Sequence, residues 1–326
     1  MPDPVTHFCF GQDVLKELSE DTVSKIDLDI FGRALQGPDS LSTIGFFGGK
    51  NKKFSVRNTV MHKQKTGAFL TALEKETEKT KLSELFSLLV GMVCHYSLDR
   101  TAHPYIICKA GDYDGTEETY HLRSGHVRLE HSIDCYFIRT RYKKTPWRFS
   151  VTDRILCLKK LPEVLRAPLD RVFNEVYGWA DGFDVFNKSL RDERLFYRLM
   201  QDPIGLVHYA LRPLSFGKTR FCMFSYYRRD TDSRLVDYMN EKHLLWHHPF
   251  DNSIESRDSF FDLYDKAKND ALEMINNCYR AVYLGENMEN IFGNSSYSTG
   301  LDVSAPENEN KPVFEPLCYG HKYWNN

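Results

Sequence analysis

The sequence predicts an all-α protein, with one multi-helix domain over residues 1–285 and a polar segment with a tail over residues 286–326. Apolar residues recur at helical spacing along most of the chain, whereas strand-like alternation is rare. The best strand candidate is TRFCMFSYYR at 219–228, although its aromatic residues could also pack a loop or a helix. No linker interrupts residues 1–285. A chain of 326 residues that is 41% hydrophobic can bury a substantial core.

Helical periodicity is clearest between residues 82 and 98, where Leu85, Leu89 and Val93 follow one another at four-residue steps. The same reasoning predicts helices over 11–19, 66–78, 125–140, 161–176, 183–200, 232–245 and 258–284. Ser256 or Asp258 is the expected N-cap of the last one. Loops are expected at 36–52 and 110–125, where glycine, proline and polar residues gather.

The last forty residues differ in composition from the rest. The stretch 286–312 contains NSSYSTG and APENENKP and is predicted to be polar and flexible. The final PVFEPLCYGHKYW has enough aromatic residues to dock back on the body. We therefore treat 286–326 as a segment separate from the helical domain.

The charge balance and the cysteines exclude several function classes. A net charge of −2 and a pI of about 6.6 leave no basic footprint, so no stable nucleic-acid complex is expected. The eight cysteines form no CxxC pair, which argues against structural thiolate zinc and a disulfide framework. The first residues resemble no secretory signal, and the longest apolar run, at 85–93, is too short to span a bilayer. We expect a cytoplasmic protein without a transmembrane segment; the sequence gives no oligomeric state.

The stretch CHYSLDRTAHPY, residues 94–105, places His95, Asp99 and His103 at four-residue intervals. On a helix, His95 and Asp99 share one face. Pro104 disfavours the α region for His103, so we expect the helix to end there and His103 to turn away. That arrangement suits two neighbouring metal ions. The alternative is an ordinary helix with polar residues, because a lone HxxxD is usually a surface pair or a cap.

A second stretch, SGHVRLEHSID at 124–134, places His126 and Glu130 one helical turn apart, flanking an apolar stripe. His131 and Asp134 form a competing pair, and periodicity does not decide between the two. A solvated polar face is the alternative to either.

Three further candidates lie upstream, namely His7, Asp39 and His62. Asp39 sits in a Gly-Pro turn that could present a carboxylate from a loop. Each residue alone is more often structural. Together with the two motifs, they supply histidine and carboxylate ligands without cysteine, which is typical of water-accessible catalytic zinc rather than closed structural zinc.

This ordered set resembles the bacterial zinc-dependent phospholipase C family, and especially its intracellular, uncharacterised branch. The resemblance rests on THFCFG (6–11), QGPD (36–39), the histidine of VMHKQKTG (60–67), HYSLDRTAHP (95–104) and HVRLE (126–130), and covers residues 1 to about 140. Single-strand-specific zinc nucleases share the implied all-helical fold.

The resemblance implies a centre of two or three zinc ions. Asp39, His62, His95 and Asp99 would bind one ion, and His103, His126 and Glu130 a second. Asp99 would bridge to a third ion, completed by His7 and the N-terminal amine and carbonyl. Asp39 would ligate the metal or deprotonate the attacking water.

These residues predict a zinc-dependent hydrolase of phosphodiesters, because clustered divalent cations activate water and neutralise phosphate charge. The expected substrate is a phospholipid or a small phosphoester. Two alternatives remain: a nuclease or nucleotidase of the same fold, and a non-catalytic metal- or lipid-binding helical protein. An HD-type phosphohydrolase fits poorly, because the chain has no adjacent His-Asp dyad.

Overall fold

The computed structural model describes residues 4–46, 50–111, 122, 125–201, 236–304 and 313–317. Helices make up most of these residues, and the strands among them form one antiparallel hairpin, so the all-α prediction is confirmed. The strand candidate at 219–228 and most of the loop expected at 110–125 lie outside the described residues. None of the described helices is long and apolar enough to cross a membrane.

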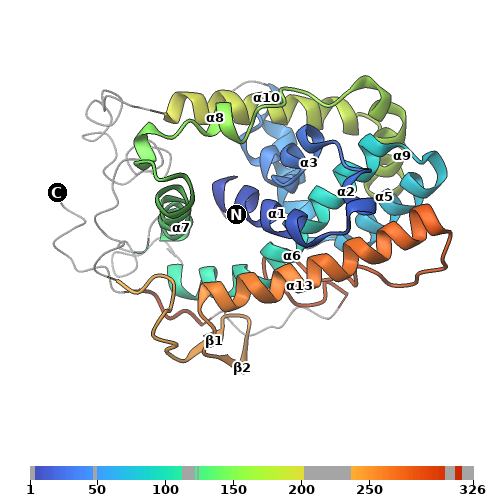
Figure 1. The fold of residues 1–326 in the computed structure, drawn as a ribbon. Helices are drawn as coiled ribbons and strands as arrows, with labels where there is room; N and C mark the ends of the chain where they lie inside the picture. Colours follow the sequence, from blue (N-terminus) through green and yellow to red (C-terminus); the bar gives the residue numbers. More distant parts are fainter. Residues whose placement is uncertain are drawn as a thin grey trace.

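The structure is organised around one buried helix, α6 (Ser83–Ala110). It is buried on nearly all sides, because other elements enclose it. Figure 1 shows α13 (Phe260–Tyr279) running beside α6 on one side of the molecule and α10 (Gly182–Met200) on the opposite side. Between them lie α1 (Pro4–Glu17), α3 (Leu28–Ala34) and α5 (Thr66–Thr80). The centre of α6 is therefore the natural place for a shielded site.

The remaining helices are shorter or lie farther out. They are α2 (Glu20–Val23), α4 (Val56–Lys63), α7 (Gly125–Tyr142), α8 (Val151–Arg154) and α9 (Arg166–Tyr177). Short 3-10 helices occupy η1 (Gly37–Thr43), η2 (Lys50–Ser55), η4 (Pro146–Arg148) and η5 (Glu163–Leu165). A π-helix, η8 (Arg280–Leu284), extends α13. The helices predicted over 66–78, 82–98, 125–140, 161–176 and 183–200 are all present.

Several predicted boundaries were wrong. Pro104 does not end α6, which continues to Ala110. Proline removes only the hydrogen bond to the Arg100 carbonyl, and packing holds the rest of this long helix in place. The first helix begins at Pro4 rather than at residue 11, since proline suits the first helical position. The N-cap of α13 is Ser259, whose side chain forms a reciprocal capping box with Asp262, and not Ser256 or Asp258.

The helix predicted over 232–245 is absent from its described part, residues 236–245. Asn240 and His243 both have positive φ there, which an α-helix does not tolerate. The Asn240 side chain also bonds the Leu244 carbonyl and amide, a local alternative to helical bonds. The loop predicted at 36–52 is partly 3-10 helix, in η1 and the start of η2. In η1, the hydroxyls of Ser42 and Thr43 donate hydrogen bonds to carbonyls three residues earlier.

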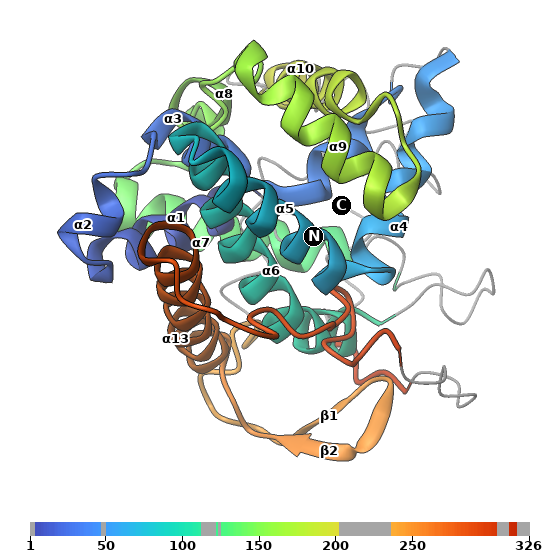
Figure 2. The ribbon, with the colours of Figure 1, turned by 90° about the vertical axis from the view of Figure 1, so that its right-hand side faces the viewer.

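A β-hairpin follows residue 245, with β1 (Trp246–His248) paired to β2 (Asp251–Ser256). The ring of His248 accepts hydrogen bonds from the Phe250 and Asp251 amides and so stabilises the turn. After α13, the chain runs back across α6 toward the start of α5 (Figure 2). This stretch falls in the segment predicted to be flexible, yet Phe292 and Tyr297 in it are buried. The boundary between domain and tail stays a prediction.

Candidate metal centre

The middle of α6 carries three of the predicted ligands on one face. His95, Asp99 and His103 lie at i, i+4 and i+8, and their side chains are buried. His103 was expected to turn away after a helix end at Pro104; that expectation was wrong, because α6 continues. Asp99 lies at the centre, with Oδ2 3.1 Å from His95 Nε2 and 3.5 Å from His103 Nδ1.

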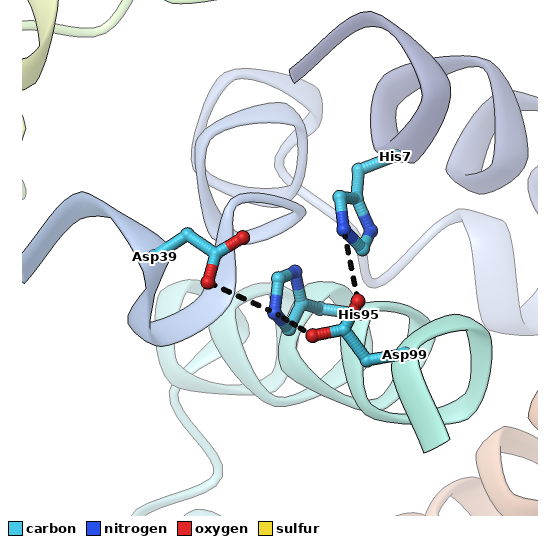
Figure 3. A group of neighbouring side chains, drawn as sticks. All are labelled: His7, Asp39, His95 and Asp99. Carbon is cyan, nitrogen blue, oxygen red and sulfur yellow. Dashed lines mark ion pairs between the residues drawn. The ribbon is translucent and has the colours of Figure 1, made fainter. Parts of the chain in front are cut away.

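Three other elements bring candidate ligands close to Asp99 and His95. His7 on α1 places Nε2 3.3 Å from Asp99 Oδ1. His62, near the end of α4, places Nε2 2.9 Å from Asp39 Oδ1 and 3.7 Å from Asp99 Oδ2. Asp39 belongs to η1, and its Oδ1 lies 3.8 Å from His95 Nε2. Figure 3 shows four of these side chains converging. We call His7, Asp39, His62, His95 and Asp99 the Asp99 group.

The QGPD turn fits closely against this group. Gly37 has a φ of +50°, and a Cβ there would lie 2.3 Å from the His95 ring. Only glycine permits both this backbone conformation and this close approach. The turn therefore brings Asp39 to the ligands of α6.

The histidine rings are oriented by backbone carbonyls. His95 Nδ1 lies 3.0 Å from the Leu35 carbonyl and His62 Nδ1 2.7 Å from the Asn58 carbonyl. A carbonyl only accepts, so Nδ1 carries the proton in both rings; when a ring is neutral, its lone pair is then on Nε2, facing the carboxylates. Metal-binding histidines are held in this way.

Burial leaves this group with unsatisfied atoms. Among the described residues, no hydrogen-bond partner reaches either oxygen of Asp99, Asp39 Oδ1, or the Nε2 atoms of His7, His62 and His95. Leaving buried polar atoms unpaired is costly. A cation between the carboxylates and imidazoles would satisfy all of them, so the donor set fits a metal ion.

The pKa shifts of Asp99 and His7 also favour metal binding by the Asp99 group. Burial acts to raise the pKa of Asp99, but the imidazoles of His103 and His95 outweigh it and hold that pKa well below its usual value. Burial, aided by His95, lowers the pKa of His7 to about 4. At neutral pH, Asp99 is therefore ionised and His7 neutral, the states in which each ligates a metal.

A second set of candidate ligands lies where α6 meets α7. Glu130 Oε1 is 2.8 Å from His126 Nε2 and 3.3 Å from His103 Nε2. We call His103, His126 and Glu130 the Glu130 group. Within the part of the chain that the structure describes, two sets of residues could hold a metal ion: this group, and His7, Asp39, His95 and Asp99, with ligand atoms within 4.8 Å of one another in each.

The competing pair on α7, His131 and Asp134, belongs to neither group. Asp134 accepts hydrogen bonds from the Val5 amide at 3.0 Å and from the amide and hydroxyl of Thr6 at 2.7 and 2.6 Å. It therefore caps the first turn of α1, the helix that carries His7. His131 is buried and belongs to neither group.

The sequence analysis missed the contribution of Tyr297. Its ring centroid lies 5.2 Å from that of His62 and 5.7 Å from that of His95. Its carbonyl lies 2.9 Å from His103 Nδ1. The motif NSSYSTG offered only polarity, and no spacing linked it to the ligands 200 residues earlier.

Comparison with known families identifies the chain. The family model for zinc dependent phospholipase C matches residues 6–181, more than half of the sequence. Neither the curated proteins nor the solved structures contain a match. The matched range includes every predicted ligand of both groups.

Proposed function

We propose that this member of the zinc-dependent phospholipase C family hydrolyses phosphodiesters, with a phospholipid headgroup as the most fitting substrate. Membership supports a zinc phosphoesterase at the level of the family. One observation in this chain supports the proposal most directly. The buried Asp99 carboxylate faces four imidazoles, and among the described residues neither of its oxygens has a hydrogen-bond partner.

Zinc bound at the two groups would lower the pKa of water and offset negative charge on the phosphate. We assign His62, His95, Asp39 and Asp99 to one ion, and His103, His126 and Glu130 to another. His7 contacts the other oxygen of Asp99, Oδ1, and would complete a third site. The N-terminal amine lies outside the described residues.

The chain's own residues would orient the reaction. Asp39 Oδ1 faces His62 and His95. We assign the other oxygen of Asp39 to accept the proton of the attacking water. The His126 side chain is 35% exposed, whereas those of His95 and Asp99 are 0% exposed. Substrate would therefore enter at the Glu130 group, which is the side of the centre that solvent reaches.

The test is hydrolysis by zinc-loaded protein of a panel: bis(4-nitrophenyl) phosphate, phosphatidylcholine vesicles and a dinucleotide. We expect turnover of the generic diester and release of the phosphorylated headgroup, and no turnover by His95→Ala. Preference for the dinucleotide would instead favour the nuclease alternative. No turnover of any substrate by protein that holds zinc would contradict the proposal and favour the non-catalytic alternative.

A further inference from the structure

The stretch that follows α13, residues 292–301, reaches both groups although it lies outside the range 6–181 that the family model matches. We call it the tyrosine segment. Its central residue, Tyr297, is 1% exposed and lies against α6. The contacts of this segment with ligand residues are specific, and they are made largely by its main chain.

The first contact is with His62 of the Asp99 group. The Tyr297 amide donates a hydrogen bond to the His62 carbonyl at 3.0 Å, and the Ser296 hydroxyl donates to the same oxygen at 3.2 Å. His62 lies next to the end of α4, where the last carbonyls have no helical partner. The segment thus supplies the donors that fix the backbone of this ligand.

The second contact is with His103 of the Glu130 group. Its Nδ1 donates to the Tyr297 carbonyl at 2.9 Å, which leaves the lone pair on Nε2. Nε2 then lies 3.3 Å from Glu130. One residue therefore fixes a ligand in each group, through its amide and its carbonyl.

The segment is anchored by residues that belong to neither group. The Tyr96 hydroxyl donates to the Phe292 carbonyl at 3.0 Å and accepts from the Ser295 amide at 2.9 Å. The Thr66 hydroxyl donates to the Ser295 carbonyl at 2.7 Å. His248 on β1 donates from Nε2 to the Thr299 carbonyl at 2.8 Å, which gives that histidine a second structural role. These anchors do not depend on a bound metal.

The far end of the segment packs against the proline in α6. Gly300 has a φ of +68°, and a Cβ there would lie 2.4 Å from the Arg100 carbonyl. That carbonyl is the one whose helical partner Pro104 removes. Any side chain at 300 would therefore push the segment away from α6, three residues from Tyr297.

We propose that Tyr297 is a positioning residue of the metal centre, and that the tyrosine segment sets zinc affinity by fixing His62 and His103. This inference rests on the proposed function, since it takes both groups to bind zinc. Residues that orient metal ligands typically change metal affinity 10–100-fold when they are altered. The segment would thus make zinc binding depend on a part of the chain 190 residues beyond His103.

The experiment compares two glycine variants of the full chain. Gly300→Ala displaces the segment without altering any ligand. Gly285→Ala is the matched control, because Gly285 also has a φ of +68° but nothing lies within 4 Å of its Cβ position. We expect zinc affinity, measured by chelator competition, to fall about 10–100-fold in Gly300→Ala and to stay within about twofold of wild type in Gly285→Ala. The absorption spectrum of the Co²⁺-loaded protein should change in Gly300→Ala alone.

A second pair of variants covers the case in which Gly300→Ala fails to fold. Tyr297→Ala removes the ring that packs on His62 and His95 and so frees the main chain at this position to move, whereas Tyr297→Phe keeps the ring. We expect weaker zinc binding and an altered Co²⁺ spectrum in Tyr297→Ala, with rescue in Tyr297→Phe. Wild-type affinity in Gly300→Ala and Tyr297→Ala would overturn this inference alone. A wild-type protein that binds no zinc would overturn it together with the proposed function.

Discussion

The Asp99 group and the Glu130 group use the same residue types but differ in what surrounds them. The Asp99 group is enclosed by α1, α4, α6 and η1, and its facing atoms lack hydrogen-bond partners among the described residues. The Glu130 group lies on α6 and α7, and the side chain of His126 is one third exposed. From this difference we propose a division of labour, in which the enclosed group would hold metal tightly and the exposed group would exchange ligands with substrate.

The largest effect should come from Asp99→Asn, which breaks the enclosed group. Asn keeps the size of the side chain but removes the negative charge that faces four imidazoles. We expect at least one zinc equivalent to be lost and activity to fall by more than about 100-fold. Metal analysis by mass spectrometry and a diester assay would measure both. If Asp99→Asn held as much zinc as the wild-type protein, Asp99 would not be a ligand of the centre.

Glu130→Gln should have a smaller effect, limited to the exposed group. Glu130 contacts only His103 and His126 among the predicted ligands. We expect one zinc equivalent to bind about 10–100-fold more weakly while the rest stays bound. Titration with a zinc chelator would resolve the two classes of site. If Glu130→Gln lost as much metal as Asp99→Asn, the two groups would form one cooperative unit, and the division of labour would be wrong.

His131, which belongs to neither group of candidate ligands, gives a pH prediction. Burial lowers the pKa of His131 to about 4, against 6.5 for a free histidine. Between about pH 6.5 and pH 4, the unfolded chain therefore binds a proton at His131 that the folded chain does not bind. The free energy of unfolding decreases as the pH falls through this range. The full loss is about 3 kcal/mol at 1.36 kcal/mol per pH unit.

Denaturant unfolding of metal-free protein at pH 7 and pH 4.5 would measure this loss of stability. His131→Gln should lose less stability than wild type over this range. An equal loss in the two proteins would show that His131 does not titrate in this way.

The smallest effect should come from Asp134→Asn, which acts on α1 rather than on a ligand. An asparagine keeps an acceptor for one amide of the first turn but loses one acceptor oxygen. We expect the free energy of unfolding to fall by about 1 kcal/mol. Because α1 carries His7, zinc bound through His7 should weaken slightly. Thermal unfolding with and without zinc would separate the two effects, and an unchanged melting temperature would refute the capping role.

The sequence predicted most of the helices because they leave local signals, and the candidate ligand residues also stand at spacings that can be recognised locally. His95 and Asp99 one turn apart, or Leu85 and Leu89 in an apolar stripe, can be recognised within a few residues. The failures concern tertiary packing. Pro104 indicates a helix end by local rules, yet α6 continues, since its neighbours hold it on nearly all sides. Nothing near Tyr297 indicates that its main chain bonds residues 200 positions away.

Long-range contacts also decided between alternatives that periodicity left open. His126 with Glu130 and His131 with Asp134 fit the same helix equally well. The difference is that Glu130 faces His103 on α6, whereas Asp134 faces the first amides of α1. The partners come from other helices, so only the folded arrangement distinguishes a candidate ligand pair from a cap.

The most direct test of a zinc centre on α6 is the metal content of the purified, unchelated protein, measured by mass spectrometry beside His95→Ala. His95 is enclosed, and its Nε2 faces both Asp99 and Asp39. We predict two or three zinc equivalents in the wild-type protein and a sharp reduction in the variant. No metal in either protein, even after zinc is supplied, would contradict the account and leave these residues as a buried polar network.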